Sequence, residues 1–169
     1  MIYFRNLLYN IVKYVSKSGV SMNINTTYTK IITGEDLMET AQHGSTLYPF
    51  QFYYEDLSVF DFNCIEWHWH TELEFIYIES GTVTLWIGED QFHLTEGNGI
   101  FINTKVLHRL YSPSKALIPN FVFMPSFIAP CDSLIYQKYI LPIISSSLPF
   151  LVFHKKVCWQ AKVLSIMRQ

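Results

Sequence analysis

Charged residues are scarce in this chain of 169 residues, at 15%, and the formal net charge is only -2. No overall positive field draws such a chain to nucleic acid, which argues against a protein that binds DNA by itself. Cysteine is also scarce, because Cys64, Cys131 and Cys158 are widely spaced, odd in number and form no CxxC pair. Reduced thiols in a cytoplasmic protein are therefore expected.

Several sequence features with a known chemistry are missing. No apolar run is long enough to span a bilayer, so no membrane partner is expected. The chain has no Gly-rich phosphate loop, no dinucleotide-binding fingerprint and no nucleophile elbow. These absences argue against nucleotide-dependent enzymes and hydrolases of the serine type.

Apolar and aromatic residues are abundant instead. Hydrophobic residues make up 50% of the chain, and aromatic residues 17%. This composition predicts a folded chain, and its length suits one domain with a helical appendage. Aromatic enrichment favours strands and a pocket or interface lined by rings.

Residues 1–44 are interpreted as an N-terminal extension, native only in part. Within it, residues 2–15 place apolar side chains on one helical stripe with basic residues beside them. One interpretation is an amphipathic helix at a membrane surface. The favoured alternative is an over-extended gene in which Met22 is the true start, so no function is assigned to this segment.

Residues 45–128 predict a β-barrel or sandwich. Short apolar runs alternate with turns such as Ser80-Gly81, Gly88-Glu89-Asp90 and Glu96-Gly97-Asn98-Gly99. Strands are expected at 50–54, 64–67, 74–78, 83–87, 91–94, 100–102, 107–111 and 120–124.

The pattern changes in residues 129–169, which predict helices. Asp132-Ser133 is expected to cap a short helix through Tyr139, which Pro142 ends or bends. A second helix is expected over 155–168, and no residue that typically closes a helix follows it, so the chain is interpreted as truncated. The broad apolar face with Trp159, Val163 and Ile166 suggests contacts with both the barrel and a second subunit.

The most informative segment contains His68, His70 and Glu74. Two histidines spaced i, i+2 lie on the same face of a strand, and a carboxylate follows. His108 lies downstream, eleven residues after Gly97. Three imidazoles and one carboxylate form a plausible first coordination shell for a divalent transition metal.

This arrangement resembles the cupin superfamily. Its first motif, G-x5-HxH-x3-E-x6-G, is matched by His68, His70, Glu74 and Gly81, with Phe62 in place of the first glycine. Its second motif, G-x5-PxG-x2-H-x3-N, is matched only at Gly97 and His108, while Asn103, Lys105 and Ser112 replace the other defined positions. The resemblance implies a double-stranded β-helix, or jelly-roll barrel, and the degraded second motif argues against enzymic metal chemistry.

A closer resemblance connects the chain with the sensor domain of AraC-family transcription regulators. It rests on the segments Trp67-His68-Trp69-His70-Thr71-Glu72-Leu73-Glu74, Glu96-Gly97-Asn98-Gly99-Ile100-Phe101-Ile102-Asn103 and Val106-Leu107-His108. The resemblance implies a mainly β barrel that binds a small effector, often a sugar, followed by helices for homodimerisation. A DNA-binding domain with helix-turn-helix units normally follows and is absent from this chain.

Three roles stay open for the cluster of His68, His70, Glu74 and His108. They either coordinate Zn, Mn, Fe or Ni, or hydrogen-bond an effector without metal, or pair with one another structurally. The metal-free effector pocket is favoured. The positive charge of Lys105, close to His108 in sequence, slightly disfavours a nearby cation.

Other polar and aromatic residues are given plainer roles. Trp67 and Trp69 are expected to pack away from the pocket, and Glu72 to face solvent. His93 and Arg109 are interpreted as surface residues. His43 lies in a loop that either covers the barrel mouth or, as favoured, is an ordinary surface loop.

The leading hypothesis is an effector-sensing domain without enzymic activity. The runner-up is a metal-dependent cupin enzyme, such as a dioxygenase or a sugar isomerase. A third hypothesis is a dimerising fragment that titrates full-length partners. Metal content distinguishes the second hypothesis from the first, and mixed dimers without a ligand response would indicate the third.

Overall fold

The computed structural model describes residues 23–24 and 29–168, so the helix expected over 2–15 and the proposed start at Met22 lie outside the described residues. The strands are β1 (Asn23–Ile24), β2 (Phe50–Asp56), β3 (Cys64–His68), β4 (Leu73–Tyr77), β5 (Thr82–Ile87), β6 (Asp90–Thr95), β7 (Gly99–Ile102), β8 (His108–Tyr111), β9 (Leu117–Phe123) and β10 (Phe150–Phe153). The helical elements are η1 (Leu57–Val59), η2 (Asp61–Asn63), η3 (Pro125–Phe127), η4 (Tyr136–Ile140), α2 (Leu141–Ile144) and α3 (Cys158–Met167).

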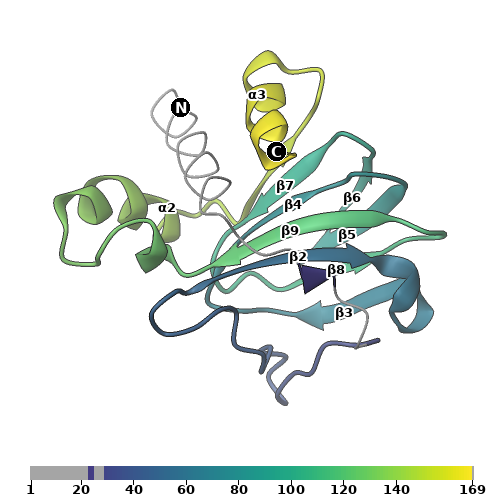
Figure 1. Cartoon of the computed structure of the whole chain (residues 1–169), viewed down its shortest axis with the longest axis horizontal. Helices are drawn as coiled ribbons and strands as arrows, with labels where there is room; N and C mark the ends of the chain where they lie inside the picture. The colour runs from purple at the N-terminus through teal and green to yellow at the C-terminus, as the bar shows by residue number, and fades with distance from the viewer. Residues whose placement is uncertain (1–22, 25–28, 169) are drawn as a thin grey trace.

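The strands form two facing sheets (Figure 1). One has the order β1-β2-β9-β4-β7-β10 and the other β3-β8-β5-β6. All pairings are antiparallel except that of β1 with β2. The expected fold, a mainly β double-stranded β-helix followed by helices, is confirmed.

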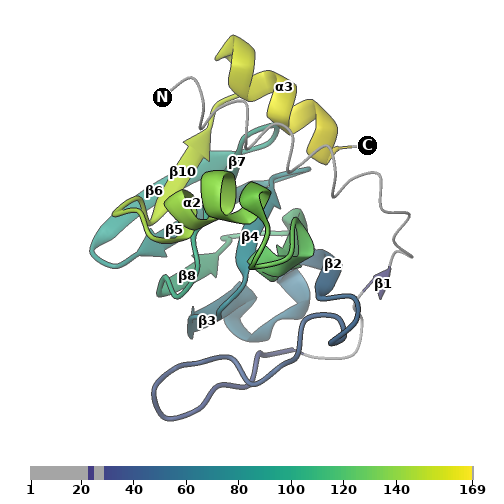
Figure 2. The same cartoon turned by 90° about the vertical axis from the view of Figure 1, so that its left-hand side faces the viewer.

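The six-stranded sheet is covered on both faces. Its inner face contributes isoleucines such as Ile76 and Ile100, which pack against Leu85 and Leu110 of the other sheet. Its outer face is aromatic, with Phe75 among a group of phenylalanines that α2 and α3 cover (Figure 2). Side chains alternate between the faces of a strand, so burial on both faces explains why every residue of β4 and β7 is buried.

A β-bulge in β3 sets the direction of the histidine side chains. The pairing of β3 with β8 shifts register between Ile65 and His68. Ile65 points into the core between the sheets, so strict alternation would turn His68 outward. The extra residue reverses the alternation, and His68 lies buried on the same side as Ile65.

The C-terminal region differs from the helical segment expected for residues 129–169. β10 lies within it and pairs with β7 from Phe150 opposite Ile102 to Phe153 opposite Gly99. Pro142 does not end the first helix, because helical backbone continues to Ile144 after a π-helical stretch at 136–140.

The expectation for α3 is confirmed in its position and in its packing on the barrel, while contact with a second subunit stays a prediction. Val163 and Ile166 are buried in the same cluster as the outer phenylalanines, and Trp159 packs against that cluster. The apolar stripe of α3 therefore packs on its own barrel. No helix within the described ranges is both long and apolar enough to cross a membrane.

Candidate functional site

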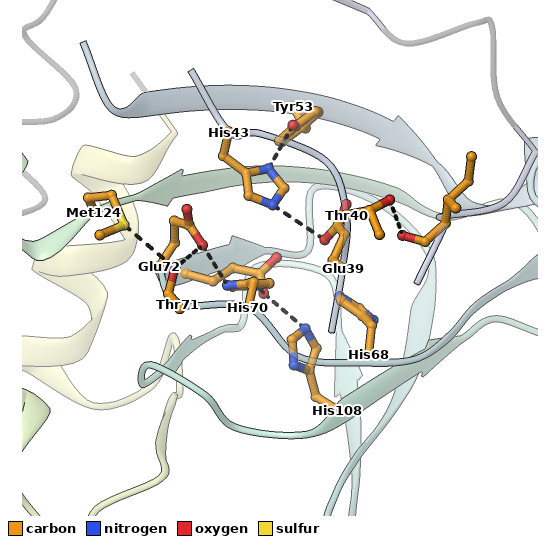
Figure 3. A network of polar contacts seen from close by, with 12 residues as sticks. Glu39, Thr40, His43, Tyr53, His68, His70, Thr71, Glu72, His108 and Met124 are labelled. Atoms are coloured by element: carbon orange, nitrogen blue, oxygen red, sulfur yellow. Dashed lines mark hydrogen bonds and ion pairs between the residues drawn. The ribbon is translucent and has the colours of Figure 1, made fainter. Parts of the chain in front are cut away.

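The four predicted site residues meet at one end of the space between the sheets. Figure 3 labels the three histidines among them. His68 ends β3, His108 begins β8, Glu74 lies in β4, and His70 lies in the connection between β3 and β4. The three histidines offer nitrogen atoms that all lie within 4.8 Å of one another, and all three side chains are buried. The spacing of the motif therefore translates into a compact cluster.

Backbone carbonyl groups orient two of the imidazole rings. Nδ1–H of His68 donates to the Glu66 carbonyl at 2.8 Å, and Nδ1–H of His108 donates to the Val106 carbonyl at 2.9 Å. These bonds place a proton on Nδ1 of each ring and leave each Nε2 free of backbone contacts. Metal-binding histidines are held in this way, with one nitrogen bonded to a carbonyl and the other directed at the metal.

Glu74 supplies the charge of the cluster. Its Oε2 lies 3.1 Å from His108 Nε2 and 3.4 Å from His70 Nε2. Burial alone would raise the pKa of Glu74, but the contacts with His108 and His70 outweigh it and hold the pKa well below its ordinary value. Burial and the nearby His108 lower the pKa of His68 well below its ordinary value. The cluster thus combines a carboxylate with a neutral imidazole at His68, the protonation states that bind metal.

A second group of polar side chains faces the cluster from the other side. His43 Nδ1 and the Tyr53 hydroxyl are in hydrogen-bond contact at 2.8 Å, and His43 Nε2 lies 3.3 Å from Glu39 Oε2. The rings of His43 and His70 meet edge to face, with centroids 5.4 Å apart. Burial lowers the pKa of His43, but Glu39 and the other nearby carboxylates raise it more, so the net change is upward.

These two groups enclose a small chamber, whose wall includes His68, His70, Glu74, Glu39, His43 and Tyr53. Glu39 and His43 belong to residues 29–49, here called the covering segment. It is fixed to the rim at Trp69, whose backbone N–H donates to Leu37 O at 3.1 Å and whose indole N–H donates to Asp36 O at 2.9 Å. The loop around His43 is therefore not an ordinary surface loop, because it covers the barrel mouth.

The chamber contains unsatisfied polar atoms that are suited to a ligand. Among the described residues, the buried side-chain atoms without a well-directed hydrogen bond are His43 Nε2, His70 Nδ1, His108 Nε2 and Asn120 Oδ1. Two of them, His43 Nε2 and His108 Nε2, have a carboxylate oxygen nearby, at 3.3 Å and 3.1 Å. All four belong to the chamber wall or to the cluster beside it. Such atoms are costly unless an ion, water or ligand satisfies them. The chamber volume of ≈ 30 Å³ suits a cation with one or two waters.

The donor set fits a divalent transition metal. Three imidazole nitrogens and a carboxylate oxygen suit Zn, Mn, Fe or Ni, and the carboxylates of Glu39 and Glu55 add negative charge to the wall. Lys105, expected to disfavour a cation, is exposed and does not line the chamber. His68, His70, His108 and Glu74 are the residues that would hold the metal.

The remaining sequence expectations have mixed outcomes. His93 is exposed and Arg109 lies at the surface, where it forms an ion pair with Glu66 at 3.0 Å. Trp67 and Trp69 are half-buried and do not line the chamber. The expectation for Glu72 was wrong, because its side chain is only 13% exposed and its Oε2 lies 3.7 Å from His70 Nδ1.

Sequence reasoning missed Glu39, Tyr53, Glu55 and Asn120 as wall residues. Tyr53 and Glu55 share one face of β2, and Asn120 pairs opposite Tyr53 in β9. Alternation along the strand at 50–54 could have placed Tyr53 opposite the phenylalanine face. Nothing in the sequence connects Glu39 with these strands.

The barrel is similar to known proteins in sequence and in structure. A family model described as the cupin domain matches residues 64–118. The structure is similar to an RmlC-like cupin from Shewanella frigidimarina, with 17% identity and a TM-score of 0.41, covering 45% of this chain and 67% of that one. It is also similar to ToxT from Vibrio cholerae, with 15% identity and a TM-score of 0.49, covering 70% of this chain and 47% of that one.

One curated relative extends the similarity beyond the barrel. The chain is 24% identical over 142 residues to the uncharacterized HTH-type transcriptional regulator YdeC of Bacillus subtilis. The match covers 82% of this chain and 48% of the relative, so the chain spans about half the length of the regulator it matches.

Proposed function

We propose that this chain is the effector-sensing domain of an AraC-type transcription regulator and that its ligand binds in the chamber at His68, His70, Glu74 and His108. The observation that carries the proposal is the convergence of three buried imidazoles and the Glu74 carboxylate beside one chamber, whose wall also includes Glu39 and His43. Burying several ionisable side chains together costs stability, so a chamber of this kind is better suited to binding than to stabilising the fold.

Similarity to a regulator favours sensing over catalysis. The relative's name describes a helix-turn-helix transcription regulator, and the match includes residues outside the barrel. We infer that DNA binding belongs to a separate helix-turn-helix domain of the regulator, and that the protein acts in the cytoplasm. The net charge of -2 agrees with a sensing domain that does not itself bind DNA.

The size of the chamber restricts how an effector binds. A volume of ≈ 30 Å³ holds an ion and water, whereas ligand pockets for drug-sized molecules have about 300–1,000 Å³. We therefore infer that the cluster holds a divalent metal, and that a carbohydrate effector enters only when the covering segment moves. The carboxylates and imidazoles of the wall supply acceptors for sugar hydroxyls.

Thermal unfolding with a panel of monosaccharides tests the sensing role. A ligand that binds only the native protein raises the unfolding temperature, and the sugar should remain chemically unchanged. The shift should disappear in Glu74→Gln and persist in Glu79→Gln, where the carboxylate is exposed. The sensing proposal fails if no sugar or other small molecule of the panel stabilises the protein.

A metal-dependent enzyme is the second candidate, because the cluster contains three imidazoles and a carboxylate. Such a site binds metal and leaves coordination positions open for a substrate. Purified protein with stoichiometric Fe or Mn that consumes dioxygen or isomerises a sugar would favour the enzyme. Metal-bound protein without turnover of the stabilising ligand would favour the sensor.

We further propose that the sensing domain forms a homodimer through its C-terminal region. Leu134 and Ile135, at the start of the first C-terminal helical stretch, are 86% and 58% exposed. Light scattering should give a dimer for the wild type and a monomer for Leu134→Glu. A monomeric wild type at high protein concentration would exclude this interface.

A further inference from the structure

A groove lies between the rim of the barrel and the C-terminal helices, outside the chamber. Its walls come from the β3–β4 connection at Thr71, the β7–β8 connection at Thr104 and Lys105, the end of β9 at Met124, and the helical region at Ser145. Its volume of ≈ 470 Å³ is far larger than that of the chamber and lies within the range of small-molecule sites.

The charge of the groove is opposite to that of the chamber. Among the residues that the structure describes, Lys105 is the one charged residue that lines it, whereas the chamber wall carries Glu39, Glu55 and Glu74. Among the described residues, Lys105 has no ion-pair partner. An anionic group in the groove would meet an unpaired ammonium and no carboxylate.

Hydroxyl groups surround the same space. Thr104, Ser126 and Ser145 line the groove, and their hydroxyls have no hydrogen-bond partner within the part of the chain that the structure describes. Hydroxyl donors together with one ammonium suit a carboxylate. Met124, Pro125 and Ile144 form an apolar part of the wall, which suits a hydrocarbon body attached to that carboxylate.

The backbone at Lys105 is held in an uncommon conformation. Its φ angle is +60°, in the left-handed region that glycine adopts more readily than lysine. Strained non-glycine residues cluster at functional sites, where the surrounding structure holds them in place. The Lys105 N–H donates to His70 O at 2.8 Å, and this bond anchors the conformation.

We propose that this groove is a second ligand site and that it binds a small amphipathic carboxylate, with Lys105 contacting the carboxylate group. The groove is separate from the chamber, but the two are connected through the β3–β4 connection at His70 and Thr71. Lys105 is bonded to His70 through the backbone, and Thr71 Oγ1 donates to Glu72 Oε2 at 3.2 Å beside His70 (Figure 3). An occupant of the groove therefore contacts residues that position the metal-binding imidazole.

Calorimetry with octanoate on the whole chain tests the proposal. Octanoate should bind at least tenfold more tightly than octan-1-ol, which lacks the charge, and than acetate, which lacks the apolar body. Lys105→Asn should weaken octanoate binding at least tenfold, and asparagine tolerates the left-handed conformation, so this variant should fold. Lys162→Gln, in the exposed face of α3, should bind octanoate as the wild type does.

Backbone amide NMR locates the bound octanoate independently of affinity. Shifts are expected at Lys105, Ser126 and Ser145 rather than at His43 or Tyr53. Binding that is equal for octanoate and octan-1-ol, unchanged in Lys105→Asn, or confined to the amides of the chamber would overturn the proposal. Metal and sugar binding at the chamber is tested separately, so failure of the groove proposal and failure of the sensing proposal are distinguishable.

Discussion

Two of the histidine rings in the cluster are oriented by backbone partners close in sequence. His68 and His108 donate to carbonyls two residues earlier, and His108 Nε2 lies 3.1 Å from Glu74. His43 has no such backbone partner and is held by Tyr53 and Glu39. We therefore expect the cluster to bind metal without help from His43, which faces the space beside it.

Replacing His43 with alanine should separate these roles. The buried Tyr53 hydroxyl and Glu39 carboxylate would each lose a partner, which should lower the free energy of unfolding by about 1–3 kcal/mol. The dissociation constant for Zn²⁺ should change by less than about threefold. Because a tenfold change equals about 1.4 kcal/mol, this is less than about 0.7 kcal/mol of binding free energy. Urea unfolding and a competition assay with a fluorescent chelator measure the two quantities.

His93→Ala serves as the control for this pair of measurements, because His93 is exposed and lies outside the chamber. It should leave both stability and Zn²⁺ affinity close to those of the wild type. A large loss of Zn²⁺ affinity in His43→Ala alone would make His43 a member of the metal site and contradict this division of roles.

At the scale of elements, β10 is as much a part of the barrel as the strands before it. Phe153 is fully buried. The centroid of its ring lies 6.3 Å from that of Phe75 and 6.2 Å from that of Trp159 on α3. β10 thus connects the six-stranded sheet with α3. Loss of the Phe153 side chain would therefore disturb the packing of the sheet and of α3.

Phe153→Ala should lower the free energy of unfolding by about 3–5 kcal/mol, the usual cost of emptying a buried phenylalanine position. Chemical denaturation measures it. Phe62→Ala removes a ring that is 90% exposed and should cost no more than about 0.5 kcal/mol. If Phe153→Ala costs no more than this control, residues 150–153 do not belong to the sheet.

The turn η1 should contribute to acid sensitivity. The Asp56 carboxylate accepts hydrogen bonds from the backbone and the hydroxyl of Ser58 and pairs with Lys115 at 3.2 Å. Partial burial raises the pKa of Asp56, but these contacts outweigh it and lower the pKa below its ordinary value. The resulting stability is present above pH 3.8, the ordinary pKa, and is lost as the pH falls through the lower folded value.

Asp56→Asn should therefore be less stable than the wild type at neutral pH, and the difference should shrink as the pH falls below 3.8. Urea unfolding at a series of pH values measures it. The exposed Asp90→Asn should show no such convergence. A difference that is independent of pH would exclude an ionised Asp56 as its origin.

Elements were predictable to different degrees. Each expected strand between residues 50 and 124 is present, because apolar runs and turn residues mark them locally. β10 was missed, since its pairing with β7 joins segments that are far apart in the chain. The motif identified the cluster, but the turning of His68 into the chamber depends on a bulge, and the closure by Glu39 and His43 depends on tertiary contacts. Local sequence patterns indicate neither the position of a bulge nor which distant segments come into contact.

At the scale of the whole molecule, the chamber and the groove divide the barrel rim into sites of opposite charge. The chamber presents carboxylates and imidazoles beneath the covering segment, and the groove presents Lys105 beside the helices. The connection at His70–Glu72 lies between them. A sensing domain with this arrangement can report on its ligand through the covering segment or through the C-terminal helices.

The most direct measurement is a calorimetric titration of metal-free protein with Zn²⁺. About one equivalent should bind, and His68→Ala combined with His108→Ala should weaken binding at least about tenfold, because even groups that only orient metal ligands contribute about 10- to 100-fold. His93→Ala should bind as the wild type does. A wild type that binds no divalent metal, or a double variant that binds with unchanged affinity, would contradict a metal-holding chamber at this cluster.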